Sequence, residues 1–313
     1  MEQFKNILLV AHGENPGTVA LKRAVTLAER NNARLTVVGV VEELPREMRS
    51  LTIALEPADL WEMMVEKRRN RLARLIEPLQ KGGLGVTSNI LRGSASLEII
   101  REVLRGKHDL VMMTAEAKGT LRETLFGGTS MHLMRKCPCP VWVMKPTSRA
   151  RYTRVLAAVD PNPSDEEHNS LNIKIMELAT SLARIEESHL HVVHAWCPIS
   201  ESTLRYTLRL PQQEVRKFIR ETEETHQKGF SDLLQKFSLE DLKVQLHLKR
   251  GVPGEVIPLL AKQKRIEVIV MGTVCRTGIA GWLIGNTAET VLRSVNCSVL
   301  TVKPDGFVTP VQL

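Results

Sequence analysis

The chain has 313 residues, of which 43% are hydrophobic and 4% aromatic, and it carries a formal net charge of +8. This length suits two domains of about 150 residues, and no apolar run approaches the roughly 20 residues that a membrane-spanning helix needs. The basic residues lie mostly on helix-like segments without interleaved aromatic residues, so nucleic acid is not an expected partner. The N-terminal segment is typical of a strand rather than a signal peptide, so we expect a cytoplasmic protein.

In the first half of the chain, short apolar runs typical of buried parallel strands alternate with stretches typical of helices. We expect strands near residues 7–11, 34–40, 86–91, 110–113 and 141–144. We expect helices near residues 18–31, 60–79, 96–105 and 129–135. Such alternation requires crossover connections and predicts a mostly parallel sheet that is covered on both faces.

The second half repeats this order. We expect its strands near residues 155–159, 190–193, 244–248, 268–271 and 299–302, its first helix near 171–183 and its last helix after Thr287. The sequence therefore predicts an α/β protein with two tandem, doubly wound (Rossmann-like) domains, each with a five-stranded parallel sheet. The expected domains are residues 1–147 and 152–313, with a short polar link between them.

An internal repeat supports this division. Residues 113–145 and 271–303 align at a constant offset of 158, which places Gly127 on Gly285 (285 − 127) and Lys145 on Lys303 (303 − 145). A repeat of this length indicates duplicated domains rather than a solenoid of small units. The offset is only 148 at the start of the copies, so we expect about ten extra residues in the second copy, some of them in loop 161–165.

The cysteines and histidines are expected to be structural. The chain has five cysteines, an odd number whose spacings match no disulfide framework, and we interpret them as small core thiols. A redox or metal pair at Cys137 and Cys139 is the alternative. His189 and His191 share one face of the predicted strand while His194 faces the other way, so they are too few for a closed zinc site. We therefore expect no metal site.

The candidate ligand site lies at one edge of the second sheet. In open α/β sheets, ligands bind beyond the carboxyl ends of the strands, where the strand order reverses. That edge carries Asp160, then Ala195 after the second strand, then residues 271–273 after the fourth. A glycine at position 272 allows a sharp turn and the close approach of a ligand.

Residues 285–287 precede the last predicted helix of the second half. The unpaired N–H groups and the positive dipole end of a helix suit a phosphate group, and Asn286 and Thr287 fit as N-cap residues. Arg276 and Thr277, in the preceding loop, could add side-chain contacts. The loop matches neither the Walker phosphate loop nor the dinucleotide fingerprint, so a purely structural turn is the alternative.

At these positions the chain resembles the universal stress protein family. The resemblance rests on residues 271–303, on the runs Val-Leu-Ala-Ala-Val-Asp at 155–160 and Leu-His-Val-Val-His at 190–194, and on Gly-Asn-Thr-Ala-Glu at 285–289. It covers nearly the whole chain, and the duplicated layout is similar to the tandem-domain type. In the ATP-binding branch of this family the motif is G-x-x-G, nine residues, then G-[ST], with Asn in the last place in some tandem members.

The resemblance implies an adenine-nucleotide site in the second domain. Gly272 and Gly285 match the first and last glycines, Asn286 takes the Ser/Thr place, Asp160 the adenosine contact and Ala195 the adenine side. The expected nucleotide-binding residues are Asp160, Ala195, Met271, Gly272, Thr273, Cys275, Arg276, Thr277, Gly285, Asn286 and Thr287. The expected ligand is ATP, with magnesium as its companion ion.

Both copies depart from the family motif. Cys275 replaces the second glycine, and a side chain there weakens binding if that position needs a positive φ or close phosphate contact. The first copy departs further and keeps only Gly127 of the motif. His12, Thr114, Ala117 and Gly128 stand at the other four places. We expect the first domain to be a degenerate copy that serves packing or binds another ligand.

The expected function is that of a cytoplasmic, regulatory stress-response protein that binds ATP or another adenine nucleotide in its C-terminal domain. No catalytic set is evident, so we name no catalytic residue. The alternatives are a slow magnesium-dependent ATPase or nucleotidyl-transfer enzyme using Asp160 and Arg276, and a scaffold without nucleotide. The resemblance also implies that the two domains pack as a pseudo-two-fold pair through strands 141–144 and 299–302, and a further homodimer is a possible assembly.

Overall fold

The computed structural model describes residues 4–11, 18–42, 57–115, 126–146, 151–161, 166–200, 202–273 and 284–313. These residues form two compact units. The first holds the described residues up to 146 together with Val308–Leu313, and the second holds those from Arg151 to Phe307. The C-terminal tail is tied to the first unit by Arg101, whose Nε donates to the carbonyl of Gln312 at 3.1 Å.

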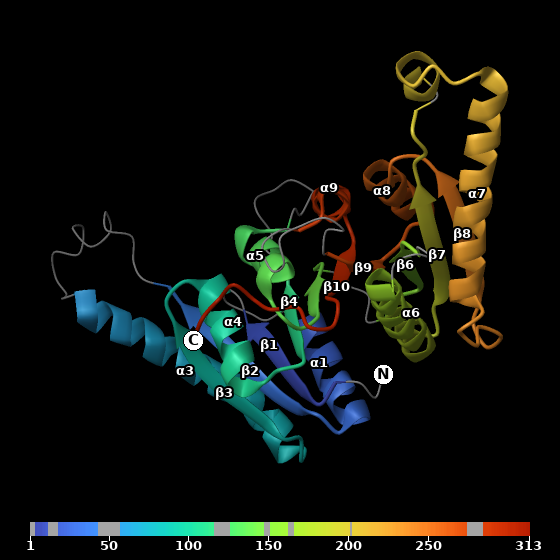
Figure 1. The fold of residues 1–313 in the computed structure, drawn as a ribbon. Helices are drawn as coiled ribbons and strands as arrows, with labels where there is room; N and C mark the ends of the chain where they lie inside the picture. The colour runs from blue at the N-terminus through green and yellow to red at the C-terminus, as the bar shows by residue number, and fades with distance from the viewer. Residues whose placement is uncertain are drawn as a thin grey trace. The chain divides into compact units, whose positions relative to one another are not determined.

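The first unit is built on five parallel strands in the order β3-β2-β1-β4-β5 (Figure 1). The strands are β1 (Asn6–Ala11), β2 (Arg34–Val41), β3 (Val86–Arg92), β4 (Leu110–Thr114) and β5 (Val141–Met144). The helices are α1 (Thr18–Asn31), α3 (Pro57–Lys81), α4 (Ala95–Gly106) and α5 (Gly128–Lys136). Right-handed crossovers place α1 and α3 on one face and α4 and α5, which contact each other, on the opposite face.

The second unit repeats this arrangement with strand order β10-β9-β6-β7-β8, again parallel in every described pair. Its strands are β6 (Arg154–Val159), β7 (His189–Trp196), β8 (Val244–Arg250), β9 (Val268–Gly272) and β10 (Ser298–Val302). Its helical elements are α6 (Glu166–Glu186), the short turn η1 (Thr203–Thr207), α7 (Gln212–Leu234), α8 (Pro253–Gln263) and α9 (Asn286–Ser294). Helices α6 and α7 cover one face, and α8 and α9 the other.

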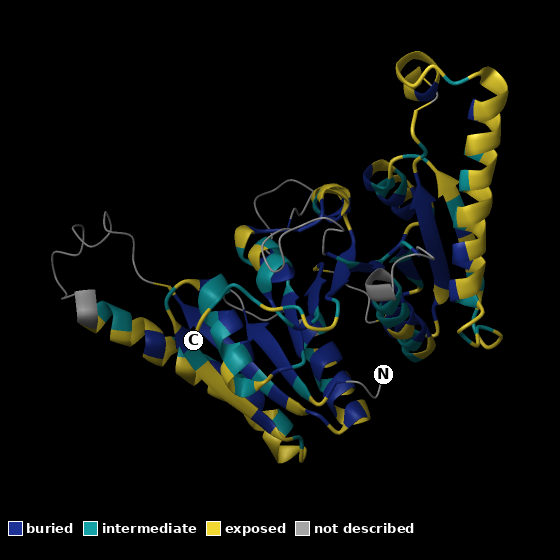
Figure 2. Ribbon diagram, viewed as in Figure 1, coloured by how far each residue is buried: buried dark blue, intermediate teal, exposed yellow. Residues whose placement is uncertain are grey.

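The burial of the strands follows from their places in the sheets. The central strands β1 and β6 are almost entirely buried, as expected where helices cover both faces, whereas the edge strands β3 and β8 expose several residues (Figure 2). No helix in the described ranges is both long and apolar enough to cross a membrane. The predicted fold class, two tandem doubly wound α/β domains, is confirmed.

The extra residues of the second copy lie mainly in one helix. The offset between the copies rises from 148 (154 − 6) at the first strands to 155 (189 − 34) at the second and 158 (244 − 86) at the third. Helix α6 has 21 residues where α1 has 14, which accounts for the first increase. The expectation that some extra residues lie in loop 161–165 is therefore wrong. Seven residues make about two helical turns, so α6 is longer than α1 while its buried face still points toward the sheet.

Candidate functional site

The strand order of the second unit reverses between β6 and β9. The chain runs from β6 outward to β8 and then returns to the other side of β6 to form β9. Ala158 pairs with Met271 in parallel register, so the carboxyl ends of the two strands lie side by side. Asp160 follows β6 directly, while Gly272 ends β9 and Thr273 follows it. Three of the expected site residues thus meet where ligands bind in this class of fold.

A buried hydrogen-bonded junction joins this edge to the start of helix α9. The N–H of Gly285 donates to the carbonyl of Thr273 at 3.0 Å. The Thr273 hydroxyl accepts a hydrogen bond of 2.5 Å from the ammonium of Lys303, and both side chains are buried. The Lys303 ammonium also lies 4.7 Å from the ring centroid of Phe307, where a cation is attracted to the aromatic face.

Sequence reasoning aligned Lys303 with Lys145 but gave neither a role. Lys145 is buried at the corresponding place in the first unit, with its ammonium 4.6 Å from the ring centroid of Phe126. Because a buried ammonium needs compensation, each lysine is a fixed part of the chain directly after the last strand of its unit, β5 or β10. The repeated Lys at the end of an apolar strand was the signal that could have identified both.

Helix α9 begins differently from the expectation. Its N-cap is Gly285, with φ −62° and ψ 139°, and Asn286 is the first helical residue. Asn286 and Thr287 are therefore not the N-cap, and no side-chain cap is formed on this helix. The N–H groups of its first turn have no acceptor within the helix, which leaves a site suited to an anion.

Gly272 is favoured by its packing against α6. A Cβ atom at this position would lie 2.8 Å from Cδ2 of Leu171, closer than real Cβ contacts allow, and the backbone is not in the left-handed region. The close approach of the helix, rather than a turn that only glycine can make, is the structural reason for the residue. By contrast, the glycines that follow β3 and β8 do need φ > 0, with 125° at Gly93 and 144° at Gly251.

Asp160 has its backbone fixed and its carboxylate partly open. Its N–H donates to Oδ1 of Asn172 on α6 at 2.8 Å, and its side chain is 45% exposed. Oδ1 of Asp160 lies 3.9 Å from Nδ1 of His194, a side chain with no exposed surface. The carboxylate can therefore accept hydrogen bonds from a ligand at the edge of the sheet.

His194 belongs to a chain of hydrogen bonds that reaches helix α7. Its Nδ1 lies 3.3 Å from the carbonyl oxygen of Val159, and its Nε2 lies 2.9 Å from Nδ1 of His226. Because the carbonyl can only accept, Nδ1 of His194 carries the proton and Nε2 accepts from His226. The His226 ring in turn stacks on Trp196, with a centroid separation of 4.9 Å.

Burial keeps this pair uncharged near neutral pH. Desolvation, with a smaller contribution from the neighbouring His226, lowers the pKa of His194 to about 4, and the bond to Val159 opposes the shift. Desolvation also lowers the pKa of His226. The contact between neutral His194 and the Asp160 carboxylate is consequently not an ion pair near neutral pH. It becomes one only when His194 is protonated in acid.

The remaining expected site residues divide into two groups. Ala195 and Met271 are buried, and Ala195 lies within β7 rather than after it, so little of either side chain can reach a ligand. Cys275, Arg276 and Thr277 lie outside the described residues, as do His12 and Ala117. In the first unit, Thr114 ends β4, Gly127 is the N-cap of α5 and Gly128 begins that helix.

Among the residues that the structure describes, the other histidines and the cysteines form no ligand set. His191 stacks on His247 with Nδ1 and Nε2 3.0 Å apart, on the opposite face of β7 from His194, as the alternation predicted. Desolvation, followed by the nearby His247, lowers the pKa of His191 to about 4. Within the described ranges, no group of three His, Cys, Asp or Glu residues is placed to hold a metal ion.

The cysteine pair of the first unit is buried and reduced. Sγ of Cys137 lies 3.5 Å from Sγ of Cys139, and the pKa of Cys139 is raised well above its ordinary value by that hydrogen bond and by burial. A thiol that resists deprotonation is a poor nucleophile and metal ligand. Cys297 is also buried, which fits the predicted core role, whereas Cys197 is exposed, so the core role expected for it is wrong.

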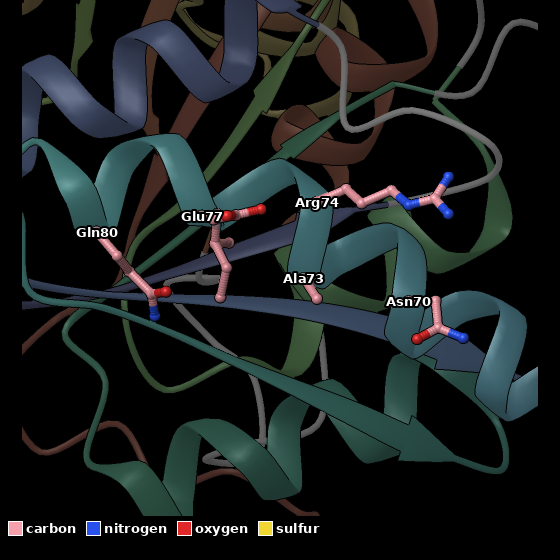
Figure 3. Close-up of a pocket in the computed structure, with 6 residues that line it drawn as sticks. Asn70, Ala73, Arg74, Glu77 and Gln80 are labelled. Carbon is pink, nitrogen blue, oxygen red and sulfur yellow. The ribbon is translucent and has the colours of Figure 1, made fainter.

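A hollow of about 350 Å³ lies against the charged face of α3 in the first unit (Figure 3). Its lining is Asn70, Ala73, Arg74, Ile76, Glu77 and Gln80, all from this one helix. None of these residues is a predicted site residue, and Glu77 is already paired with Lys81 at 2.8 Å. The hollow is therefore not part of the candidate site at the β6–β9 edge.

A sheet whose strand order reverses beside a helix start without a side-chain cap defines the open, doubly wound class of α/β protein, in which ligands bind at the switch point. The profile of the Universal stress protein family matches residues 3–145 and 151–303, so the chain belongs to this family and contains two of its domains. The chain is 30% identical over 315 residues to Universal stress protein E of Salmonella typhi and of Escherichia coli K12, covering 100% of this chain and 98% of each relative. These relatives confirm the expected similarity to the tandem-domain type of the family.

A solved structure has the same fold over nearly the whole chain. A putative universal stress protein from Pseudomonas aeruginosa UCBPP-PA14 superimposes with a TM-score of 0.70 and 28% identity, covering 98% of this chain and 95% of the other. A universal stress protein from Archaeoglobus fulgidus, with a TM-score of 0.60 and 17% identity over 96% of this chain, shares the fold. The tandem arrangement is thus found along the full length of these relatives.

Proposed function

We propose that the second unit binds an adenine nucleotide, ATP in the first instance, and that the protein acts as a regulatory binding protein in the stress response of the cytoplasm. One observation carries the proposal. Asp160, the Gly272–Thr273 strand end and the uncapped start of α9 meet at the β6–β9 switch point and are linked through the hydrogen bond from Gly285 to Thr273.

Each part of this edge has a distinct task. The Asp160 carboxylate accepts hydrogen bonds from the ribose hydroxyl groups, and the backbone N–H of Asp160 is held by Oδ1 of Asn172. The N–H groups of the first turn of α9 bind the phosphates, which the positive end of the helix dipole also favours. Arg276 and Thr277, which lie outside the described residues, are proposed to add side-chain contacts.

Magnesium, when present, would be held chiefly by phosphate oxygens and water. Mg²⁺ commonly keeps several waters and one or two carboxylates beside substrate phosphates. The described residues around Asp160 offer no set of groups arranged for phosphoryl transfer, so we assign binding rather than turnover. The first unit has Thr114 and Gly128 at the matching positions and is proposed not to bind ATP.

Titration calorimetry of ATP into the full chain tests the proposal. We expect saturable binding at up to millimolar ATP and at least about a ten-fold loss of affinity in Asp160→Asn, because a neutral amide accepts more weakly than a carboxylate. Asp232→Asn, on the exposed side of α7, is the matched control and should bind like the wild type. Absence of measurable binding by the wild-type chain would reject the function.

A further inference from the structure

The free edge of strand β8 carries backbone groups that no described strand of the second unit pairs. β8 is the last strand of its sheet, and among the described strands it pairs in parallel with β7 alone. The carbonyl of Lys243, directly before β8, and the N–H of Gly251, directly after it, both bond to the backbone of β7, at 2.9 Å and 2.8 Å. Because the residues that bond to a neighbouring strand alternate along the chain, the odd-numbered residues of β8 face β7. The N–H and C=O groups of Leu246 and Leu248 therefore point away from β7, toward the free edge.

An apolar side chain lies in the middle of this free edge. Leu246 is 53% exposed, and Leu248 beside it is half-buried. The internal repeat supplies a comparison, because Leu246 aligns with Ser88 of β3 at the offset of 158 (246 − 88). β3 is the edge strand of the first unit, and its exposed middle residues Ser88 and Asn89 are polar. An exposed apolar edge strand is a template for pairing with another chain, so the edge of the second unit is better suited to pairing than the edge of the first.

The sequence of β8 is complementary to itself in one antiparallel register. A two-fold axis through His247 places Leu246 of each copy opposite Leu248 of the other, where their backbone groups can exchange hydrogen bonds and their side chains lie on the same face. An axis through Leu246 would instead place Lys243 of one copy opposite Lys249 of the other, and like charges directly opposite each other are destabilising. An axis through Leu248 would pair less of the strand. The register centred on His247 is therefore the favourable one.

The charged residues of β8 do not oppose this register. Gln245 of one copy lies opposite Lys249 of the other, and Val244 lies opposite Arg250, so each cation faces an uncharged side chain. His247 of one copy faces His247 of the other on the axis. Burial, more than the nearby lysines, lowers the pKa of His247, so the two rings meet uncharged near neutral pH. Each strand thus offers the other apolar or uncharged partners along its whole length.

We propose that β8 pairs in antiparallel fashion with β8 of a second copy of the chain, so that the free edge of the second unit is a homodimer interface. Each pair of Leu246 and Leu248 contributes its backbone hydrogen bonds and an apolar contact, and removes Leu246 from water. A second copy is the occupant because the strand is complementary to itself, which a two-fold interface requires. One strand pair is small beside the roughly 1,600 Å² of a standard protein interface, so the dimer is reversible and depends on concentration.

Sedimentation velocity of the full chain without nucleotide, at concentrations from about 1 μM to about 200 μM, tests this inference independently of ATP binding. We expect an equilibrium between monomer and dimer. Leu246→Lys places a charge on the middle of the edge and should weaken the dimer at least about ten-fold. Leu246→Pro removes an N–H that β7 does not use, so it should weaken the dimer similarly while the pairing with β7 remains.

A disulfide between copies tests the register. In His247→Cys, combined with Cys197→Ser to remove an exposed thiol, the two copies of residue 247 would lie opposite each other in a pair without mutual hydrogen bonds. Their Cα atoms would be about 4.5 Å apart, which is within the range that a disulfide spans. Mild oxidation should therefore link the two copies, and peptide mapping should assign the disulfide to position 247 of both.

A matched control comes from the same unit. Leu259 is 57% exposed, about as much as Leu246, but lies on α8, so Leu259→Lys should dimerise like the wild type. Circular dichroism checks that every variant stays folded. A wild-type chain that remains monomeric over the whole range, or equal weakening in Leu246→Lys and Leu259→Lys, would overturn the proposal. A dimer that persists in Leu246→Lys, or that gives no disulfide at position 247, would place self-association on another surface and reject pairing through β8.

Discussion

Nε2 of His194 lies 2.9 Å from Nδ1 of His226, so strand β7 and helix α7 share an imidazole pair, of which His194 is buried and His226 half-buried. The other ring nitrogen of His194 faces the carbonyl of Val159 and, at 3.9 Å, the carboxylate of Asp160. Helix α7 is therefore connected by two rings to the turn where the proposed nucleotide site begins. This arrangement makes the protonation of His194 matter to both stability and ligand binding.

The first prediction concerns acid. The folded pKa of His194 is about 4, below its ordinary value of 6.5, so the unfolded chain binds more protons than the folded chain between these values. The stability that neutral His194 contributes is complete above pH 6.5 and is lost as the pH falls toward 4. At about 1.4 kcal/mol per pKa unit, the loss approaches about 3 kcal/mol.

Urea unfolding at pH 7.5, 6 and 4.5 measures this effect. The variant His194→Gln should be less stable than the wild type at pH 7.5 but should lose less unfolding free energy on acidification, since the titrating ring is gone. His189→Gln, on an exposed strand residue, is the control and should follow the wild-type curve. An unchanged pH dependence in His194→Gln would show that this ring does not titrate as described.

The second prediction separates two kinds of glycine. Gly272→Ala should destabilise the fold by about 1–3 kcal/mol, because the new Cβ atom would press on Leu171. Gly128→Ala begins α5 with open space around the added atom, so it should be neutral or stabilising by about 0.4–1 kcal/mol. Thermal unfolding of the two variants measures both changes in stability. The double variant Gly272→Ala, Leu171→Ala should show a smaller penalty than the two single costs added together.

The third prediction concerns the buried lysine of the second unit. Lys303→Met removes the donor to Thr273 and leaves a buried hydroxyl without that bond, which should cost about 1–3 kcal/mol. A double-mutant cycle with Thr273→Val measures the coupling of the two side chains. We expect a coupling of at least about 0.5 kcal/mol, as found for contacting polar pairs. Strict additivity of the two losses in unfolding free energy would contradict the hydrogen bond between Lys303 and Thr273.

The fourth prediction concerns thiol reactivity. Cys197 is exposed, whereas Cys137, Cys139 and Cys297 are buried, and the pKa of Cys139 is raised. A thiol reagent applied to the folded protein should modify Cys197 rapidly and the three buried thiols only on unfolding. Peptide mass mapping after brief labelling assigns the sites. Rapid labelling of Cys139 in the native protein would contradict its burial.

Most of the fold could be predicted from the sequence because the strands are central and apolar. The ranges expected for 18–31 and 141–144 agree with α1 and β5 residue for residue, since both are bounded by clear changes in polarity. Helices α7 and α8 and the turn η1 were implied only by the repeat and were not placed individually. Their exposed residues blur the helical pattern, and η1 has no counterpart among the described residues of the first unit.

The site was predictable in part. The positions of Asp160, Gly272 and Gly285 at one sheet edge follow from the order of parallel strands, which sequence analysis captured. The chain from His194 to His226 could not be read from strand alternation alone, because its second ring comes from a distant helix. A signal did exist: His226 and Phe230 are separated by four residues, and this spacing puts the histidine on the inward face of α7.

The role expected for Asn286 and Thr287 as N-cap residues was wrong, because a structural glycine took that place. Propensity favours Asn and Thr at an N-cap, yet Gly285 is held there by its bond to Thr273. Tertiary hydrogen bonding thus moved the helix start by one residue. The side chains of Asn286 and Thr287 consequently belong to the first turn of α9, beside the N–H groups proposed to meet phosphate.

The stoichiometry of ATP binding to the full chain tests the central claim most directly. Calorimetry or equilibrium dialysis should give one ATP per chain, because only the second unit combines Asp160 with a glycine at the end of its fourth strand. Cys275→Gly should raise the affinity at this one site and leave the stoichiometry unchanged. Two ATP molecules per chain, or one that persists undiminished in Asp160→Asn, would contradict the assignment of the site to the second unit.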